Sequence, residues 1–150
     1  MKKIPFPQAN NLERIYSIFL SIDARGVSKF DIIKSQGLAE REGAYYLDAL
    51  YFLGYLEKYN TKYFLSKAGV QLQHHCFGDG KAVFAKEILK HHFFYDVYRQ
   101  RDTFSEDKDF RAYIVHKISN DYQIGLNTAK RRASSVVAWL QWIDNNMKDE

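Results

Sequence analysis

Apolar residues in the first part of the chain recur at intervals of three and four positions, which places them on one face of a helix. The positions concerned are Leu12, Ile15, Tyr16, Phe19 and Ile22. We expect this helix to begin at Asn10 or Asn11. The asparagine at position 10 lies three residues before Glu13, the spacing at which two side chains cap a helix reciprocally. Gly26 is expected to close the segment.

Two further helices are predicted directly after the first. Ser28 and Asp31 have the spacing of a capping box and predict a short helix over 28–36. Helical spacing of apolar residues predicts a third helix over 40–53, which a glycine then stops. The inward positions of the third helix are Tyr46, Ala49, Leu50 and Leu53.

The hydrophobic period changes after the third helix. Short aromatic-rich runs over 55–59 and 63–65 flank Asn60-Thr61, a pair that suits a tight turn, so we predict a β-hairpin. Ser66 then caps a fourth helix that begins at Lys67. Three short helices followed by a two-stranded hairpin are the order of a winged helix-turn-helix.

The second half of the chain shows only helical patterns. A helix is predicted over 81–101, broken near His91-His92, and another begins at Ser105 and buries apolar residues at helical spacing. A loop over 121–127 then leads to a final helix over 128–147. No run in this half has the alternation or the turn residues of a hairpin.

Two glycines within 76–80 follow the end of a predicted helix and mark the best internal boundary. We therefore expect two units, a winged helix-turn-helix over 1–76 and a helical, winged-helix-like unit over 77–150 that packs against it. The fold class expected is mainly α, with one small β-hairpin.

Charge and composition restrict the function less than the pattern restricts the fold. The net charge of +4 permits a nucleic-acid partner but does not require one. Cys76 is the only cysteine and has no internal disulfide partner. The first residues lack the apolar stretch of a secretory signal, and no apolar run reaches the roughly 18 residues of a membrane span. We expect a cytoplasmic protein without membrane contact.

The third predicted helix carries the first set of candidate DNA contacts. In helix-turn-helix proteins the outward residues near the start of this helix meet base edges in the major groove. Here those residues are Arg41, Glu42, Tyr45 and Asp48. Arginine can pair with guanine and carboxylates can accept from cytosine, although carboxylates also repel phosphate. The alternative is an ordinary solvated helix face.

The start of the final predicted helix carries the second set. Its first turn is expected to hold three consecutive cations, with two serine hydroxyls one turn later. These residues are Lys130, Arg131, Arg132, Ser134 and Ser135. Cations oppose the macrodipole at a helix start, whereas a backbone phosphate placed there would accept hydrogen bonds from N–H groups and side chains. Pairing with Asp121 or with the acidic end of the chain is the alternative.

The predicted hairpin tip supplies a third set of candidate contacts. Lys58 and Lys62 flank the Asn60-Thr61 turn, as expected of a wing that touches the sugar-phosphate backbone. A surface turn with two lysines and no ligand is equally common.

The patterns that could indicate catalysis or a metal are weaker. Glu106-Asp107-Lys108 resembles the carboxylate-lysine triplet of restriction-type nucleases, but it is predicted at the start of a helix rather than on a strand. His74-His75-Cys76 and His91-His92 lack the regular spacing of a zinc site. The sequence Gly78-Asp79-Gly80-Lys81 is too short for a phosphate-binding loop. We expect no enzyme activity, no cofactor and no metal.

Several segments together carry a family resemblance. They are Phe6–Arg14, Ala44–Leu50, Leu53–Glu57, Tyr63–Gly69, and Thr128–Val136 with Trp139-Leu140-Gln141-Trp142-Ile143. The chain resembles a bacterial winged-helix module found appended to or beside restriction-modification and related DNA-processing proteins. The resemblance implies binding to double-stranded DNA, by a regulator or by a recognition or targeting subunit. A nuclease or another DNA-processing protein is then an expected partner, and a homodimer is compatible with this role.

A protein–protein interaction module is the second hypothesis. In it the helical units grip a partner chain through exposed aromatic side chains. The candidates for this role are Tyr45, Tyr51, Phe52, Trp139 and Trp142. A winged helix supports either use, so the fold alone does not decide between them.

Overall fold

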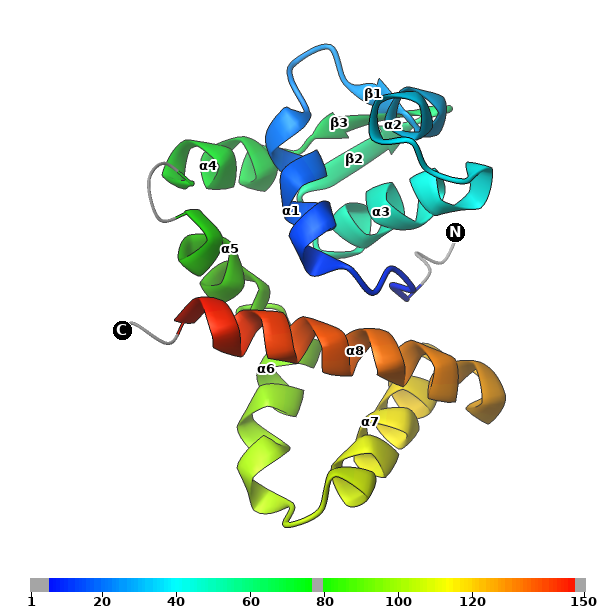
Figure 1. Ribbon diagram of the computed structural model, residues 1–150, viewed down its shortest axis with the longest axis vertical. Helices are drawn as coiled ribbons and strands as arrows, with labels where there is room; N and C mark the ends of the chain where they lie inside the picture. The colour runs from blue at the N-terminus through cyan, green and yellow to red at the C-terminus, as the bar shows by residue number, and fades with distance from the viewer. Residues whose placement is uncertain (1–5, 77–79, 148–150) are drawn as a thin grey trace.

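The computed structural model describes residues 6–76 and 80–147, and it is mainly helical with one small antiparallel sheet (Figure 1). The first half contains α1 (Leu12–Ser21), β1 (Val27–Ser28), α2 (Lys29–Gln36), α3 (Glu40–Phe52), β2 (Leu56–Tyr59), β3 (Lys62–Leu65) and α4 (Lys67–His75). The second half contains α5 (Gly80–Ile88), α6 (His92–Gln100), the short 3-10 helix η1 (Arg101–Thr103), α7 (Asp107–Tyr122) and α8 (Leu126–Met147).

Local capping signals place the first helices where the sequence predicts them. The Asn11 side chain accepts a hydrogen bond from the backbone N–H of Arg14, at 3.0 Å, and starts α1. The reciprocal cap predicted for Asn10 and Glu13 is wrong, because with Asn11 as the cap the third helical residue is Arg14, and the Glu13 carboxylate binds Lys81 and the indole of Trp142. The predicted capping box of α2 is confirmed, since Ser28 and Asp31 each accept a hydrogen bond from the other's backbone.

The predicted hairpin is confirmed and gains a third strand. Tyr59 pairs with Lys62 across the two-residue turn, where Asn60 has a positive φ of 55°, a conformation that asparagine tolerates. The strand β1 adds antiparallel to β3, so the sheet order is β1-β3-β2. The sequence did not predict β1, because two residues are too few to show an alternating pattern.

Every described secondary-structure element of the second half is a helix, as expected. The predicted break lies between α5 and α6, where the His91 imidazole accepts a hydrogen bond from the backbone N–H of Phe93 and caps α6. The start predicted for the final helix is wrong by two residues. The helix α8 begins at Leu126, because the Gly125 carbonyl already accepts a helical hydrogen bond from Ala129, at 2.9 Å.

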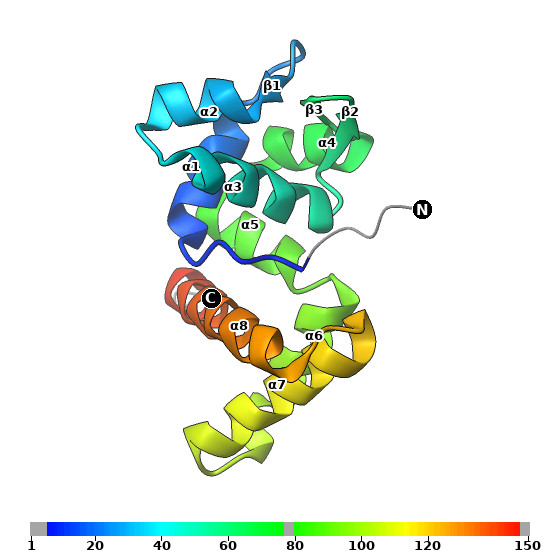
Figure 2. The same cartoon turned by 90° about the vertical axis from the view of Figure 1, so that its right-hand side faces the viewer.

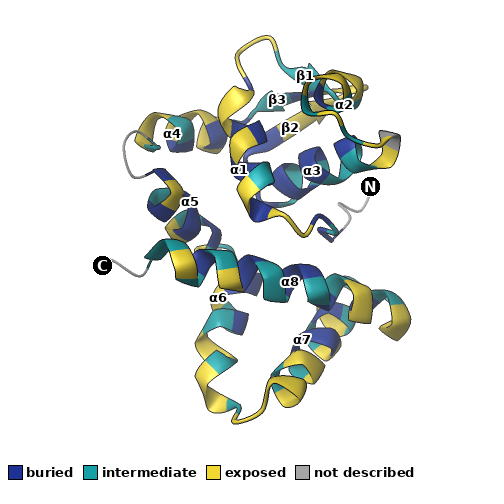
Figure 3. Cartoon of the chain, viewed as in Figure 1, coloured by how far each residue is buried: buried dark blue, intermediate teal, exposed yellow. Residues whose placement is uncertain are grey.

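The two halves share one continuous hydrophobic core. The helix α8 runs between α1 and α3 on one side and α6 and α7 on the other (Figures 1 and 2). Phe6, from the segment before α1, packs edge-on against Phe52 of the first half and against Phe93 and Tyr122 of the second. Figure 3 shows buried positions on α1, α3 and the central part of α8. The expected boundary at 76/77 adjoins residues 77–79, which lie outside the described residues.

Candidate nucleic-acid interface

Three segments that carry predicted DNA contacts lie on one side of the molecule. The start of α3, the turn between β2 and β3, and the start of α8 all lie toward the right of Figure 1, the side that faces the viewer in Figure 2. Up to about 90 residues of sequence separate these segments, and along the long axis of the molecule the hairpin lies near the top of Figure 1 and the start of α8 in its lower half. We call this side of the molecule the basic face.

The start of α3 offers the basic face one fully accessible side chain. Among its four candidates only Arg41 is exposed. Glu42 and Tyr45 are half-buried and line a small hollow of about 220 Å³ with residues 8–11. The Asp48 carboxylate accepts a hydrogen bond from the Tyr63 hydroxyl, at 2.5 Å, and thereby ties α3 to β3. The expected outward face of α3 is therefore open at its first turn only.

The basic stretch of α8 lies one turn later in its helix than the sequence predicts. Because α8 begins at Leu126, Lys130, Arg131 and Arg132 occupy its second turn, away from the free N–H groups of the first. Ser135 is only 3% exposed and donates a hydrogen bond to Asn10, at 2.5 Å. The predictions of a cationic first turn and of a phosphate contact from Ser135 are therefore wrong.

The cations of α8 reach two neighbouring elements. Arg132 is half-buried and lies close enough to Tyr45 of α3 to interact with it electrostatically. Burial and the adjacent positive charge of Arg131 lower the pKa of Arg132 below its usual value. A nearby anion would offset both effects.

The structure adds one cation that the sequence analysis did not identify. Arg111 of α7 is exposed, and its guanidinium donates hydrogen bonds to the hydroxyl of Ser134 and to the backbone carbonyl of Lys130. Arg111 and Lys130 are 19 residues apart, so only the packing of α7 against α8 brings them together. No local sequence signal indicates this contact.

The cations of the basic face form no ion pair with a described carboxylate. Within residues 6–76 and 80–147, no ion pair forms to Arg41, Lys58, Lys62, Arg111, Lys130, Arg131 or Arg132. Asp121 was a predicted partner for the α8 cations. Its carboxylate instead binds Lys117 at 3.0 Å. The acidic end of the chain, 148–150, lies outside the described residues. Asp31 of α2 nevertheless interacts electrostatically with Lys62, so this lysine has an acidic neighbour although it forms no ion pair.

The hairpin tip adds an aromatic side chain to its two lysines. Lys58 and Lys62 are both exposed, and the Lys58 ammonium lies 5.1 Å from the centre of the Tyr63 ring. Tyr59, next to the turn, is 60% exposed. A tip with two cations and an exposed ring can contact both phosphate and sugar.

The aromatic residues proposed for gripping a protein partner are not exposed. Trp139 is 1% exposed, and Tyr45, Tyr51, Phe52 and Trp142 are half-buried against the core. Trp139 stacks on Phe94, and its indole N–H donates to the Ala9 carbonyl at 2.8 Å. The expectation that these side chains form an exposed contact surface is wrong, because they pack within the molecule, as Phe52 does against His91 and Tyr122.

The residues of the weaker catalytic and metal-binding patterns can be located in the fold. Glu106 precedes α7, forms an ion pair with Lys108, and lies on no strand. Over the described parts of the chain, no three histidine, cysteine, aspartate or glutamate side chains are grouped so that they could hold a metal ion. None of the described helices is both long enough and apolar enough to cross a bilayer.

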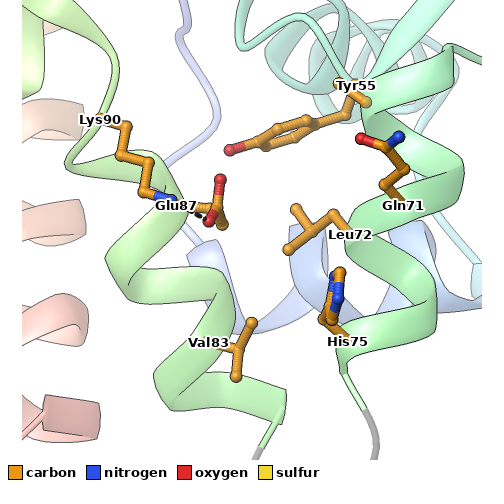
Figure 4. A pocket seen from close by; sticks show the side chains of 8 residues that line it. Tyr55, Gln71, Leu72, His75, Val83, Glu87 and Lys90 are labelled. Carbon is orange, nitrogen blue, oxygen red and sulfur yellow. Dashed lines mark hydrogen bonds and ion pairs between the residues drawn. The ribbon is translucent and has the colours of Figure 1, made fainter.

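A separate cavity of about 410 Å³ lies between α4 and α5 (Figure 4). The Tyr55 hydroxyl points into it toward Glu87, whose carboxylate is bound by Lys90 at 2.6 Å. Burial and the charge of Glu87 raise the pKa of Tyr55. Its hydroxyl therefore stays protonated at neutral pH and can donate a hydrogen bond but cannot act as a base.

The cap of α6 predicts a pH dependence of stability. Burial, and to a smaller extent the neighbouring His92, lower the pKa of His91 from 6.5 to about 4. Between these values the unfolded chain binds more protons at this site, so stability falls as the pH is lowered through 6.5 toward 4. Allowing for the partial exposure of His91, the free energy of unfolding should be about 1 kcal/mol lower at pH 5 than at pH 7.

Urea unfolding at the two pH values measures this difference. His91→Asn provides the matched control, because asparagine can cap the helix but does not titrate. An equal pH dependence in the variant would show that His91 is not its source.

Comparison with known proteins assigns the chain to a family. Residues 14–148 match the family described as a domain of unknown function, DUF7226, and the chain belongs to that family. No curated protein and no solved structure matches the chain.

Proposed function

We propose that this protein binds double-stranded DNA through the basic face and does so without catalysing a reaction. The observation that carries the proposal is that three cation-bearing segments, from α3, the hairpin and α8, lie on one side of the molecule, and that their cations form no ion pair within the described residues. Cations without an ion-pair partner favour a polyanion, because binding releases the counter-ions condensed on the phosphates.

The topology of the first half supports a winged helix-turn-helix. Its order is α1-β1-α2-α3-β2-β3, with the sheet order β1-β3-β2. Gly43 allows α3 to approach α2 closely, since a Cβ at this position would lie 2.6 Å from the Ile33 side chain. In this interpretation α3 is the recognition helix and the β2–β3 hairpin is the wing.

The burial of Glu42 and Tyr45 defines how α3 would meet the duplex. Its first turn would enter the major groove end-on and present Arg41 to a base edge, where an arginine pairs best with guanine. Lys58 and Lys62 would contact the backbone on one flank, and the cations of α8 would do so on the other. Contacts with the DNA backbone position a protein on the duplex without reading the base sequence.

The proposed biological role follows from DNA binding by α3. A chain of this size with one base-reading helix suits a regulator, or a recognition or targeting subunit that works with a nuclease in a DNA-processing or restriction system. The resemblance of the sequence to modules of that kind supports this role and a cytoplasmic location.

The salt dependence of binding tests the proposal. Each phosphate contact contributes about 0.9 to the slope of log affinity against log salt, so about five to seven contacts predict a slope on the order of 4–6. Fluorescence titration of a mixed-sequence duplex across a series of salt concentrations measures this slope. Absence of binding at low salt would contradict the proposal.

A further inference from the structure

A second cationic surface lies away from the basic face. Where α5 meets α6 the surface is hollowed into a groove of about 600 Å³. Its lining residues are Lys86, Leu89, Lys90, Tyr95, Tyr98 and Arg99. In Figure 1 α5 lies on the left, whereas the hairpin turn and the start of α8 lie on the right. The groove is therefore separate from the proposed duplex site.

The aromatic side chains of the groove are held in place by charged neighbours. Tyr95 is 50% exposed, and the Arg99 guanidinium lies 5.3 Å from the centre of its ring. The Tyr98 hydroxyl donates to Asp144 at 3.2 Å, and the guanidinium of Arg101 lies 3.9 Å from the centre of the Tyr98 ring. The tyrosine rings are thus held by charged neighbours, and Leu89 is the apolar residue that lines the groove beside them.

The charge of the groove has one sign. Three of its lining residues are cationic and none is acidic. Lys90 is partly neutralised by Glu87, outside the groove lining, while Arg99 forms no ion pair with a described residue. An occupant that carries negative charge and a flat group would match the cationic lining and the exposed ring of Tyr95.

We propose that the α5–α6 groove binds a segment of single-stranded nucleic acid. One base stacks on the Tyr95–Arg99 pair, and the flanking phosphates lie against Lys86 and Lys90. Only an unpaired strand exposes base faces beside a charged backbone, and aromatic platforms in basic grooves bind such strands with little sequence preference. An acidic peptide matches the charge of the rim but does not use the flat tyrosine surface.

Titration of a fluorescent twelve-nucleotide oligothymidylate with the full chain tests this proposal. Tyr95→Ala should weaken binding about tenfold, whereas Tyr95→Phe, which keeps the ring, should stay within about twofold of the unaltered protein. Phe30→Ala removes a ring of comparable exposure from α2 and should have no effect. Arg99→Gln should weaken binding and reduce its salt dependence.

The same titrations separate this proposal from duplex binding. The Arg131→Ala, Arg132→Ala double variant should lose duplex affinity but keep its affinity for the oligothymidylate. If the double variant loses affinity for both the duplex and the oligothymidylate while Tyr95→Ala keeps both affinities, the single strand binds at the basic face and the proposal is wrong. Equal displacement of the oligonucleotide by a polyglutamate of the same charge would also overturn it. Failure of duplex binding alone would contradict only the function proposed above.

Discussion

Replacing Trp139 with alanine is expected to lower the free energy of unfolding by about 3–5 kcal/mol, the usual cost of removing a buried aromatic side chain. Trp139 is 1% exposed and stacks on Phe94 with a ring separation of 5.1 Å. Its indole N–H also satisfies the Ala9 carbonyl, which would lose this partner in the variant. The change would thus remove packing between α8 and α6 and a buried hydrogen bond from α8 to the segment before α1.

Urea unfolding monitored by circular dichroism measures the loss, and Trp142→Ala is the matched control. Trp142 is half-buried and donates to the exposed carboxylate of Glu13 at 3.1 Å. Its removal should therefore cost clearly less than that of Trp139. Equal losses in the two variants would contradict the packing described for α8.

Replacing Arg131 and Arg132 together with alanine is expected to weaken binding to every duplex by about 30-fold at 0.15 M salt and to lower the salt slope by about 2. Both figures follow from the loss of two phosphate contacts. Because phosphates carry no sequence information, the loss should be the same for a preferred and a scrambled site. Arg25→Ala is the control, since Arg25 is exposed but paired with Asp23 at 2.8 Å.

Arg41→Ala should behave differently from the double variant. If Arg41 contacts a base edge, its removal should cost about 1–3 kcal/mol at the preferred site and much less at a scrambled one. The preferred site is obtained by selection from random duplexes with the unaltered protein. Equal losses on both duplexes would show that α3 does not read bases, and targeting would then depend on a partner.

Signals confined to a few consecutive residues were sufficient to predict much of the fold. The capping box of Ser28 and Asp31 and the Asn60-Thr61 turn depend on neighbouring side chains, and each appears where the sequence indicates it. The break at His91 has the same local character, because the imidazole caps the helix that follows it.

The candidate interface was less predictable, because its accessibility depends on packing between distant segments. Tyr45 lies on the predicted outward side of α3, but residues 8–11 and Arg132 lie beside it. Arg111 joins the α8 cations only through the contact of α7 with α8. Ser135 faces inward because α8 lies against the segment that contains Asn10. Helical periodicity identifies the faces of one helix but not the element that covers each face.

NMR mapping of the duplex contacts locates the DNA-binding surface residue by residue. A uniformly ¹⁵N-labelled sample is titrated with a mixed-sequence duplex at low salt, and the backbone amide shifts are followed residue by residue. If the duplex binds at the basic face, the largest changes should fall near Arg41, over 58–62 and over 126–132, and added salt should reverse them. Changes confined to the α5–α6 groove, or no changes at low salt, would contradict duplex binding by the basic face.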